Sequence, residues 1–510
     1  MAHTLGIDIG TFESKGVLVD RSGAIVAEAT TPHQMIVPRP GWAEHRATED
    51  WWGDFVRLCR ALLDQSGVAP QGIGAVAASA IGPCMLALDA AGQPLMNGVL
   101  YGVDTRASRE IADLTAALGA DAIRARGGNA LTSQSVGPKI LWLRRNRPEI
   151  FARSARLVGA ASYLTFRLTG AHVIDHYTAA GFSPLYDIAA QGWRDDLDQI
   201  CPAAMLPDLM WSTGIAGHVT PEAAAETGLA AGTPVTCGTI DAAAEAVSVG
   251  VRDPGDMMIM YGSTVFIILV TPQRLSDPRL WHAPWLYPGS HAAMAGLATS
   301  GTLTHWFRDH VARDLARDTA FAALADEAAA SPPGARGLIC LPYFSGERTP
   351  IHDPAARGAF FGLDLTHRRG DLYRAVLEGI ASATRHITET YAEAGAPPGR
   401  VLAVGGGTRN APWLQATSDL TGLDQELCRV SAGAAYGNAF LAAVAIGAAA
   451  PGDIAAWNPP ARRITATAHP VYERQYPLFR RLYEQTRDIA AELADPEPQG
   501  GAGDSSRAGP

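Results

Sequence analysis

The sequence has no pair of cysteines at the C-x-x-C spacing typical of zinc and redox sites, because its six cysteines are scattered over 510 residues. This scatter favours reduced thiols in a cytosolic protein over a disulfide framework. Long Lys/Arg blocks are also absent, and the formal net charge of −10 argues against a nucleic-acid partner. No G-x-x-x-x-G-K-[ST] segment occurs, which excludes a P-loop nucleotide site.

The N-terminus lacks both the basic and the apolar segment of a signal peptide. One uncharged stretch, residues 431–452, has alanine as its commonest residue and carries Tyr436 and Asn438. Alanine contributes too little transfer free energy for membrane insertion, so we predict a buried helix there. We therefore expect a cytoplasmic protein without a membrane partner.

The composition, 47% hydrophobic and 18% charged, is typical of a globular protein. The length favours two or three domains. Turn-forming residues in VGVRDPGD, residues 249–256, predict a boundary that divides the chain into domains over residues 1–250 and 251–490. Residues 491–510 are predicted to be a disordered tail, since Pro, Gly, Ser and Asp dominate from Asp495 onward.

Strand and helix patterns alternate along both halves, which predicts an α/β fold. In the first half we expect a β-meander over residues 4–30, a helix over 48–65, and strands over 73–79 and 86–88. In the second half we expect a hairpin over residues 257–270, a long helix over 371–394, and a strand over 401–404. That last strand runs directly into Gly405–Gly407.

The first candidate site is the run DIGTFESKGVLVD, from Asp8 to Asp20. A Gly10-Thr11 turn between two strands leaves backbone N–H groups and a hydroxyl free to face phosphate oxygens. Lys15 supplies a positive charge for phosphates, and Asp8 could hold Mg²⁺ directly or through water. For this run alone, an ordinary β-hairpin remains the alternative.

The second half repeats the strand–turn–strand pattern at Gly262-Ser263-Thr264. Two such hairpins facing a cleft between two α/β domains would hold a polyphosphate from both sides. Asp241 lies in a glycine-flanked, apolar turn, where it is either a catalytic carboxylate or the N-cap of the helix that follows. Gly405–Gly407 is either a ligand loop or a plain turn after a strand.

With further segments, these motifs resemble the FGGY family of carbohydrate kinases from about residue 4 to about residue 480. The segments are GWAEHRATEDWW (41–52), YGVDTRA (101–107), GPKILWLRRNRP (137–148), GTIDAAAEAVSVG (238–250), PYFSGERTPIHDPAARGAFFGL (342–363) and GGGTRNAPWLQATSD (405–419). The resemblance implies two actin-like (ribonuclease H-like) α/β domains of the sugar kinase/Hsp70/actin superfamily with a cleft between them. It also implies ATP and Mg²⁺ as cofactors.

The resemblance implies a role for each matching residue. Asp241 would accept the proton of the sugar hydroxyl, and Asp8 would organise the metal. The nucleotide contacts would be Thr11, Lys15, Ser263, Thr264, Gly301, Gly406 and Asn410. The substrate contacts would be Gly82, Pro83, Asp104, Gln134 and Asp241 itself. Arg348 and Trp142 are interpreted as structural.

The motifs look most like the xylulokinase branch of the family, which phosphorylates the terminal hydroxyl of ketopentoses. D-xylulose is the first expected substrate and D-ribulose the next, and a homodimer is compatible with the resemblance. Two departures stand out: Ile81-Gly82-Pro83 replaces the common Gln-Met-His, and Phe12-Glu13 replaces small hydroxyl residues. A sugar sensor with weak kinase activity is therefore one alternative. An Hsp70-like nucleotide-gated chaperone is another, although no peptide-binding domain follows the second half.

Overall fold

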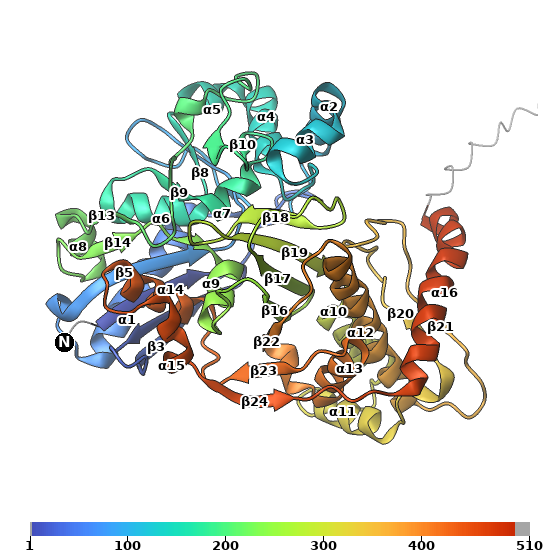
Figure 1. The fold of residues 1–510 in the computed structure, drawn as a ribbon. Coiled ribbons are helices and arrows are strands. Elements are labelled where there is room, and N and C mark those ends of the chain that lie inside the picture. The colour runs from blue at the N-terminus through green and yellow to red at the C-terminus, as the bar shows by residue number, and fades with distance from the viewer. Residues whose placement is uncertain (1–2, 495–510) are drawn as a thin grey trace, which may run out of the picture.

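Two seven-stranded sheets form the framework of the molecule in the computed structural model, which describes residues 3–494 (Figure 1). The order of the first sheet is β13-β14-β5-β1-β2-β3, with β15 also paired to β5. Its strands are β1 (His3–Ile9), β2 (Glu13–Val19), β3 (Ile25–Pro32), β5 (Ile73–Ala80), β13 (Ile215–His218), β14 (Pro234–Thr236) and β15 (Thr239–Ile240). The predicted β-meander and the strand after it are confirmed.

The second sheet has the order β18-β19-β17-β16-β22-β23-β24. Its strands are β16 (Asp256–Tyr261), β17 (Val265–Thr271), β18 (Trp281–Pro284), β19 (His291–Leu297), β22 (Arg400–Val404), β23 (Gln425–Cys428) and β24 (Pro460–Ile464). The antiparallel β16–β17 pair is the predicted second hairpin. β22 runs parallel to β16, which places the glycines after β22 beside the hairpin turn.

Alternate residues of a strand point to opposite sides, and in the central strands β1 and β16 both sets are largely buried. In β1, Leu5 and Ile7 pack with Phe55 of α1 (Gly53–Ser66). In β16, Met257 and Ile259 pack with the long helix α12 (Arg369–Glu393), which confirms the helix predicted over residues 371–394. The helix predicted over residues 48–65 is also present, but its first turn is the π-helix η1 (Ala47–Trp52).

Two helices lie between the sheets, on the faces opposite α1 and α12: α9 (Asp241–Ser248) and α14 (Ala434–Ala445). Glycine allows their close approach. A Cβ atom at Gly437 of α14 would lie 1.9 Å from the Ala244 oxygen of α9, and one at Gly6 of β1 would lie 2.0 Å from the Ala435 oxygen. The helix predicted within residues 431–452 is therefore buried, and it packs on the first sheet although it comes from the second half of the chain.

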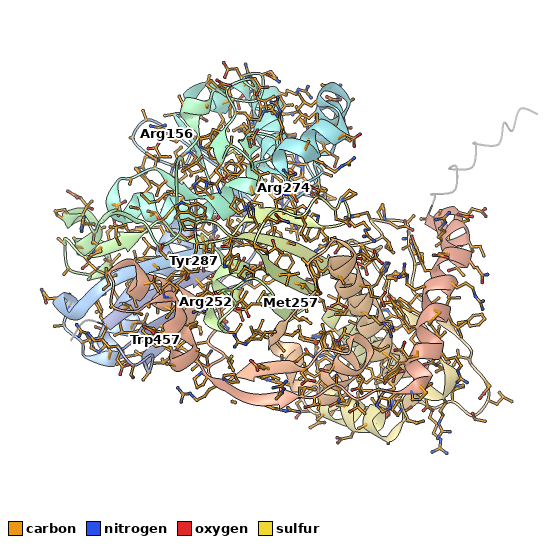
Figure 2. The ribbon with its side chains drawn as sticks, in the orientation of Figure 1. Arg156, Arg252, Met257, Arg274, Tyr287 and Trp457 are labelled. Carbon is orange, nitrogen blue, oxygen red and sulfur yellow. The ribbon has the colours of Figure 1, made fainter. Side chains whose placement is uncertain are left out.

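Side chains fill the space between these layers (Figure 2). Trp457, labelled there, packs so closely on the β2–β3 turn that a Cβ atom at Gly23 would lie 2.5 Å from its ring. The Tyr436 hydroxyl donates to the Gly23 oxygen over 2.7 Å, so the C-terminal part is joined to the first sheet at this turn. No helix within residues 3–494 is both long enough and apolar enough to span a bilayer.

The remaining helices cover the outside of the two sheets and form a lobe at the top of Figure 1. They are α2 (Ser108–Leu118), α3 (Ala120–Gly127), α4 (Val136–Asn146), α5 (Pro148–Arg153), α6 (Ala160–Thr169), α7 (His176–Ala179), α8 (Pro221–Thr227), α10 (Gly301–Val311), α11 (Ala320–Ala330), α13 (Ala411–Thr421), α15 (Ile454–Trp457) and α16 (Pro470–Ala494). The short strands are β4 (Glu44–His45), β6 (Leu86–Leu88), β7 (Gly98–Val99), β8 (Arg156–Val158), β9 (Val173–Asp175), β10 (Tyr186–Asp187), β11 (Gly192–Trp193), β12 (Asp208–Met210), β20 (Ile339–Leu341) and β21 (Ala359–Phe361).

The predicted tail begins later than we expected. Helix α16 continues through residues 491–494, so the assignment of these four residues to a disordered tail was wrong. The rest of the predicted tail, residues 495–510, lies outside the described residues.

Candidate active site

The register of three parallel strands brings two candidate carboxylates to one edge of the first sheet. Asp8 of β1 pairs with Ser79 of β5, and Ser79 pairs with Thr239 of β15. Asp241 follows two residues after Thr239 and begins α9. The carboxyl ends of parallel strands are the usual place for ligands in α/β sheets, and both acidic groups lie there.

Asp241 does not act as the N-cap of α9. Ile240 occupies that position, no side-chain cap bond is present, and the Asp241 Oδ1 accepts only from the neighbouring Ala242 N–H, over 2.7 Å. Burial and, to a smaller extent, the negative charge of Asp8 together raise the pKa of Asp241 to about 8. The side chain keeps some accessible surface although protein surrounds it closely. A carboxylate with a pKa near neutrality suits proton transfer.

Asp8 is held by a buried hydrogen-bond chain. Ser79 Oγ donates to Asp8 Oδ1 over 2.6 Å, and Asn438 Nδ2 of α14 donates to both Ser79 Oγ, at 2.7 Å, and the Ile7 oxygen, at 2.8 Å. Burial raises the pKa of Asp8 to about 6, against the lowering effects of the Ser79 bond and the Lys15 charge. The Asn438 contacts thus connect α14, from the second half of the chain, to β1 and β5.

Lys15 stands opposite Asp8 in the β1–β2 ladder, as the hairpin prediction requires. Its Nζ lies 3.2 Å from Oε1 of Glu13, and both side chains are close to half exposed. An ion pair this exposed contributes about 0–1 kcal/mol, so Lys15 can leave Glu13 for a more strongly charged partner. The acidic residue that departs from the family pattern is therefore paired with the predicted phosphate-binding lysine.

Glu245 is a third carboxylate at this site that sequence reasoning missed. It lies one turn after Asp241 on α9, and burial raises its pKa to about 7, with a further contribution from the charge of Asp8. A Cβ atom at Gly433 would lie 2.7 Å from Glu245 Oε2, so the loop before α14 closes over it. The i, i+4 spacing from Asp241 was the signal that could have identified it.

Tyr101 is a second residue that the sequence interpretation left without a role. Burial raises the pKa of Tyr101, a hydrogen bond with Thr11 lowers it, and the charges of Asp241 and Arg348 also act on it. Tyr101 therefore lies near the first hairpin turn and near the candidate base. Its position at the start of the YGVDTRA segment was the sequence feature that could have identified it as a site residue.

The second hairpin turn is joined to the start of α10. Gly301 N–H donates to the Gly262 oxygen over 3.1 Å, and Thr302 N–H donates to the Ser263 oxygen over 3.0 Å. A Cβ atom at Gly301 would lie only 2.3 Å from the Gly262 oxygen, so this contact needs glycine. Ser263, Thr264 and Gly301, predicted from separate motifs, thus belong to one structural unit.

The glycine loop after β22 lies beside the same hairpin. Gly405 has a φ of +92°, and a Cβ atom there would lie 2.7 Å from the Tyr261 oxygen. A Cβ atom at Gly406, in contrast, would meet no atom within 4 Å, so there is space for a ligand beside this residue. The Asn410 Oδ1 accepts from Trp413 N–H at 3.2 Å, and its Nδ2 donates to the Tyr373 hydroxyl at 3.3 Å. Its side chain therefore caps α13.

The predicted sugar contacts Gly82 and Pro83 are adjacent in the chain, and Gly82 lies against the residue before Asp241. A Cβ atom at Gly82 would lie 2.9 Å from the Ile240 side chain, which immediately precedes Asp241. Pro83 follows Gly82 and packs against Gly181. Gln134 is partly exposed, and its Oε1 accepts from Gly102 N–H over 3.2 Å.

Asp104 does not have the environment of a sugar ligand. It is fully buried, its Oδ2 accepts from Ala43 N–H over 2.7 Å, and both of its oxygens accept from Arg106. Arg106 also bonds Glu44 and lies over the Trp42 ring at 4.0 Å. The direct sugar contact expected of Asp104 is not supported, because its oxygens are bound to the protein itself. Trp142, at 5.1 Å from the Arg106 guanidinium, is a core residue, as predicted.

Similarity to known proteins was found along almost the whole chain. The models of the FGGY family of carbohydrate kinases match residues 3–248 (N-terminal domain) and 257–446 (C-terminal domain). Xylulose kinase of Escherichia coli (strain K12) is 31% identical over 96% of this chain and 100% of its own length. Xylulose kinase of Bacillus subtilis (strain 168) is 28% identical over 97% and 99%. The crystal structure of xylulose kinase from Rhodospirillum rubrum superposes with a TM-score of 0.89, at 33% identity, over 96% and 99%.

The two sheet-based α/β domains therefore have the actin-like ATPase fold, which confirms the predicted fold class. The chain belongs to the FGGY family of carbohydrate kinases. It is a carbohydrate kinase, and the family implies ATP as the phosphate donor.

Proposed function

We propose that this protein transfers the terminal phosphate of ATP to the terminal hydroxyl of a ketopentose, with D-xylulose as the preferred substrate. The observation that carries the proposal is full-length similarity, at 31% and 33% identity, to two proteins named xylulose kinase. D-ribulose is the next candidate, since it differs from D-xylulose only in the configuration of one hydroxyl group.

Asp241 is the proposed catalytic base. A sugar hydroxyl must lose its proton as it attacks the phosphate, and a nearby carboxylate accepts it. The pKa of about 8 follows from burial and from the charge of Asp8, so the carboxylate is a stronger base than an exposed aspartate. In this proposal Gly82, Pro83 and Gln134 contact the sugar, and Tyr101 joins them from beside Thr11. Asp104 instead positions the segment that carries Tyr101.

The proposed nucleotide site combines the turns of both hairpins. Thr11 and Lys15 would bind phosphate from the first sheet, and Ser263, Thr264 and Gly301 would bind it from the second. Gly406, with open space around it, would lie against the adenosine. Asn410 would act indirectly, by fixing the start of α13 behind the glycine loop.

Asp8 is the proposed Mg²⁺ ligand. No group of three or more His, Cys, Asp or Glu side chains in residues 3–494 is arranged to hold a metal ion. This fits Mg²⁺, which commonly uses one or two carboxylates together with water and nucleotide phosphates. The carboxylate of Asp8 has a pKa raised by burial and only Lys15 as a nearby cation, so a divalent ion there would be well accommodated. When bound, Mg²⁺ neutralises charge on the phosphates being transferred.

The test is ADP release with Mg·ATP and D-xylulose, L-xylulose, D-ribulose, L-ribulose, ribitol, glycerol or no sugar. We expect D-xylulose to give the highest kcat/KM, with at least about tenfold discrimination against D-ribulose, because one mispaired buried hydroxyl costs about 1–3 kcal/mol. Highest activity with a polyol would contradict the ketopentose assignment. Sugar binding without ADP release would favour a sensor.

A further inference from the structure

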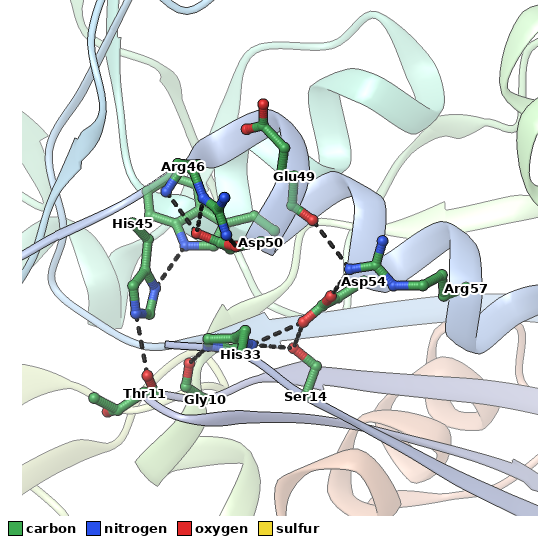
Figure 3. Close-up of polar contacts among 11 residues, drawn as sticks. Gly10, Thr11, Ser14, His33, His45, Arg46, Glu49, Asp50, Asp54 and Arg57 are labelled. Atoms are coloured by element: carbon green, nitrogen blue, oxygen red, sulfur yellow. Dashed lines mark hydrogen bonds and ion pairs between the residues drawn. The ribbon is translucent and has the colours of Figure 1, made fainter. Parts of the chain in front are cut away.

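Three consecutive carbonyl groups of the first hairpin turn are held by two histidine-bearing segments. Figure 3 shows the contacts at Gly10 and Thr11. His33 Nε2 donates to the Gly10 oxygen over 3.1 Å, and His45 Nε2 donates to the Thr11 oxygen over 3.1 Å. The backbone N–H of His33 donates to the Phe12 oxygen over 3.0 Å. His33 directly follows β3 and His45 ends β4, so two separate segments hold one turn.

These contacts fix which way the turn presents its donors. In a trans peptide, the C=O and N–H groups point in opposite directions. Because the Gly10 and Thr11 oxygens point towards the histidines, the N–H groups of Thr11 and Phe12 point to the other side of the turn. Phosphate oxygens bind to successive backbone N–H groups that converge in this way.

The partners of His33 determine its charge. Nδ1 lies 2.8 Å from Oδ2 of Asp54, and Nε2 faces the Gly10 carbonyl oxygen, so both ring nitrogens face acceptors. Both must carry a proton, and His33 is therefore an imidazolium. Its side chain is 3% exposed and that of Asp54 is 0% exposed. Asp54 also accepts from Ser14 Oγ over 2.7 Å and from Arg57, which holds the acceptor in place.

His45, unlike His33, is neutral. Trp51 Nε1 donates to His45 Nδ1 over 3.1 Å, so this nitrogen carries no proton and the ring is neutral with its proton on Nε2. The two rings meet edge to face at 4.8 Å. One charged ring beside one neutral ring avoids the repulsion that two buried cations would cause. Each ring thus has the single protonation state that lets it donate to the turn.

We propose that His33 and His45 are positioning residues that orient the Thr11 and Phe12 N–H groups toward the terminal phosphates of the nucleotide. This inference rests on the proposed function, in which the first hairpin turn binds ATP. Within residues 3–494, the side-chain hydrogen bonds of the two histidines go to the turn and to Ser14, Asp54 and Trp51. They would therefore act on the nucleotide through the backbone.

The test compares two replacements of His33 that differ in the donor they keep. Glutamine places an amide N–H near the position of Nε2, whereas asparagine places one near Nδ1. We expect His33→Asn to weaken binding of Mg·AMP-PNP about tenfold, the effect of losing one charge-assisted hydrogen bond. His33→Gln should recover most of this loss. The measurement is isothermal titration of the full chain without sugar.

AMP serves as the second probe, because it carries the adenosine and lacks the terminal phosphates. We expect its affinity to be unchanged in both variants. A matched control is His282→Asn, since His282 is also buried and its Nε2 also bonds a carbonyl, that of Asp277 at 3.2 Å, in the second half of the chain. It should leave binding of Mg·AMP-PNP unchanged. His45→Asn and His45→Gln provide a second pair with the same expected order.

Equal binding of Mg·AMP-PNP by His33→Asn and the unchanged protein would overturn the inference, and so would an equal loss of AMP affinity, which indicates general damage. These outcomes are separate from failure of the proposed function. If the proposed function failed, the unchanged protein would bind Mg·AMP-PNP but phosphorylate none of the sugars. The comparison of the His33 variants would still give its result.

Discussion

Replacement of Asp241 by asparagine will reduce kcat for ADP release by about 10²–10⁴-fold, the usual contribution of a general base. Asparagine keeps the shape of the side chain and an oxygen for the Ala242 N–H, but it cannot accept a proton. We expect D-xylulose and Mg·AMP-PNP to bind within a few-fold of their normal affinities. Turnover within tenfold of normal would show that another group accepts the proton.

The pH dependence of the unchanged enzyme gives a second readout of the same residue. Asp241 must be ionised to act as a base, and its pKa is raised to about 8 by burial and by the charge of Asp8. We therefore expect kcat/KM for the sugar to rise with pH and to level off above about pH 8. A flat profile between pH 6 and pH 8 would contradict this role.

Stability should respond in the opposite direction to activity. The folded-state pKa of Asp241 is above its unfolded value, so the folded protein holds this proton more tightly. The contribution of the protonated Asp241 side chain to the free energy of unfolding is fully present below about pH 4. It is lost as the pH rises to about 8. Asp241→Asn removes that loss, so its Tm at pH 8 should equal or exceed that of the unchanged protein. A lower Tm would mean that the inactive variant is also damaged.

Replacement of Arg106 by methionine will lower the free energy of unfolding by about 3–5 kcal/mol, because it leaves buried carboxylates without their cation. The Arg106 side chain is 1% exposed and pairs with Asp104 and Glu44, each at 2.8 Å. Methionine retains apolar contact with Trp42 and Trp142. The loss of stability therefore measures mainly the effect of removing the positive charge. Urea unfolding at pH 7 is the measurement.

Arg147→Met is the matched control for this experiment. Arg147 pairs with Glu149 at 2.8 Å, but its side chain is 50% exposed and that of Glu149 is 63% exposed. Removing this exposed pair should change the free energy of unfolding by less than about 1 kcal/mol. If Arg106→Met had an equally small effect, the buried ion pair would not stabilise the first half of the chain.

The sequence predicted the framework well because local patterns decide it. The β1–β2 and β16–β17 hairpins have glycine turns between apolar strands, and α12 has a long apolar face that ends at Gly395. The late start of the tail was missed because residues 491–494, which are all good helix formers, directly precede the proline-rich segment. The helix therefore continues past its last buried residue, Ala490.

The site was harder to predict because a motif gives residue types without their hydrogen-bond partners. Asp104 is bound by Arg106, two positions later, and Asn410 caps α13 ahead of a proline. Both local signals were visible in the sequence. Glu245 was indicated locally only by its i, i+4 spacing from Asp241. His33 acquires its role from Gly10, which is distant in sequence, and no local pattern indicates that contact.

The most direct test of the central claim is phosphorus-31 NMR of the products formed from D-xylulose and ATP with Mg²⁺. Phosphorylation of the terminal hydroxyl predicts one sugar phosphate monoester whose phosphorus couples to the two protons of a CH₂ group. It should form in amounts equal to ADP and should be absent with Asp241→Asn. ADP with inorganic phosphate and no sugar phosphate would contradict the account.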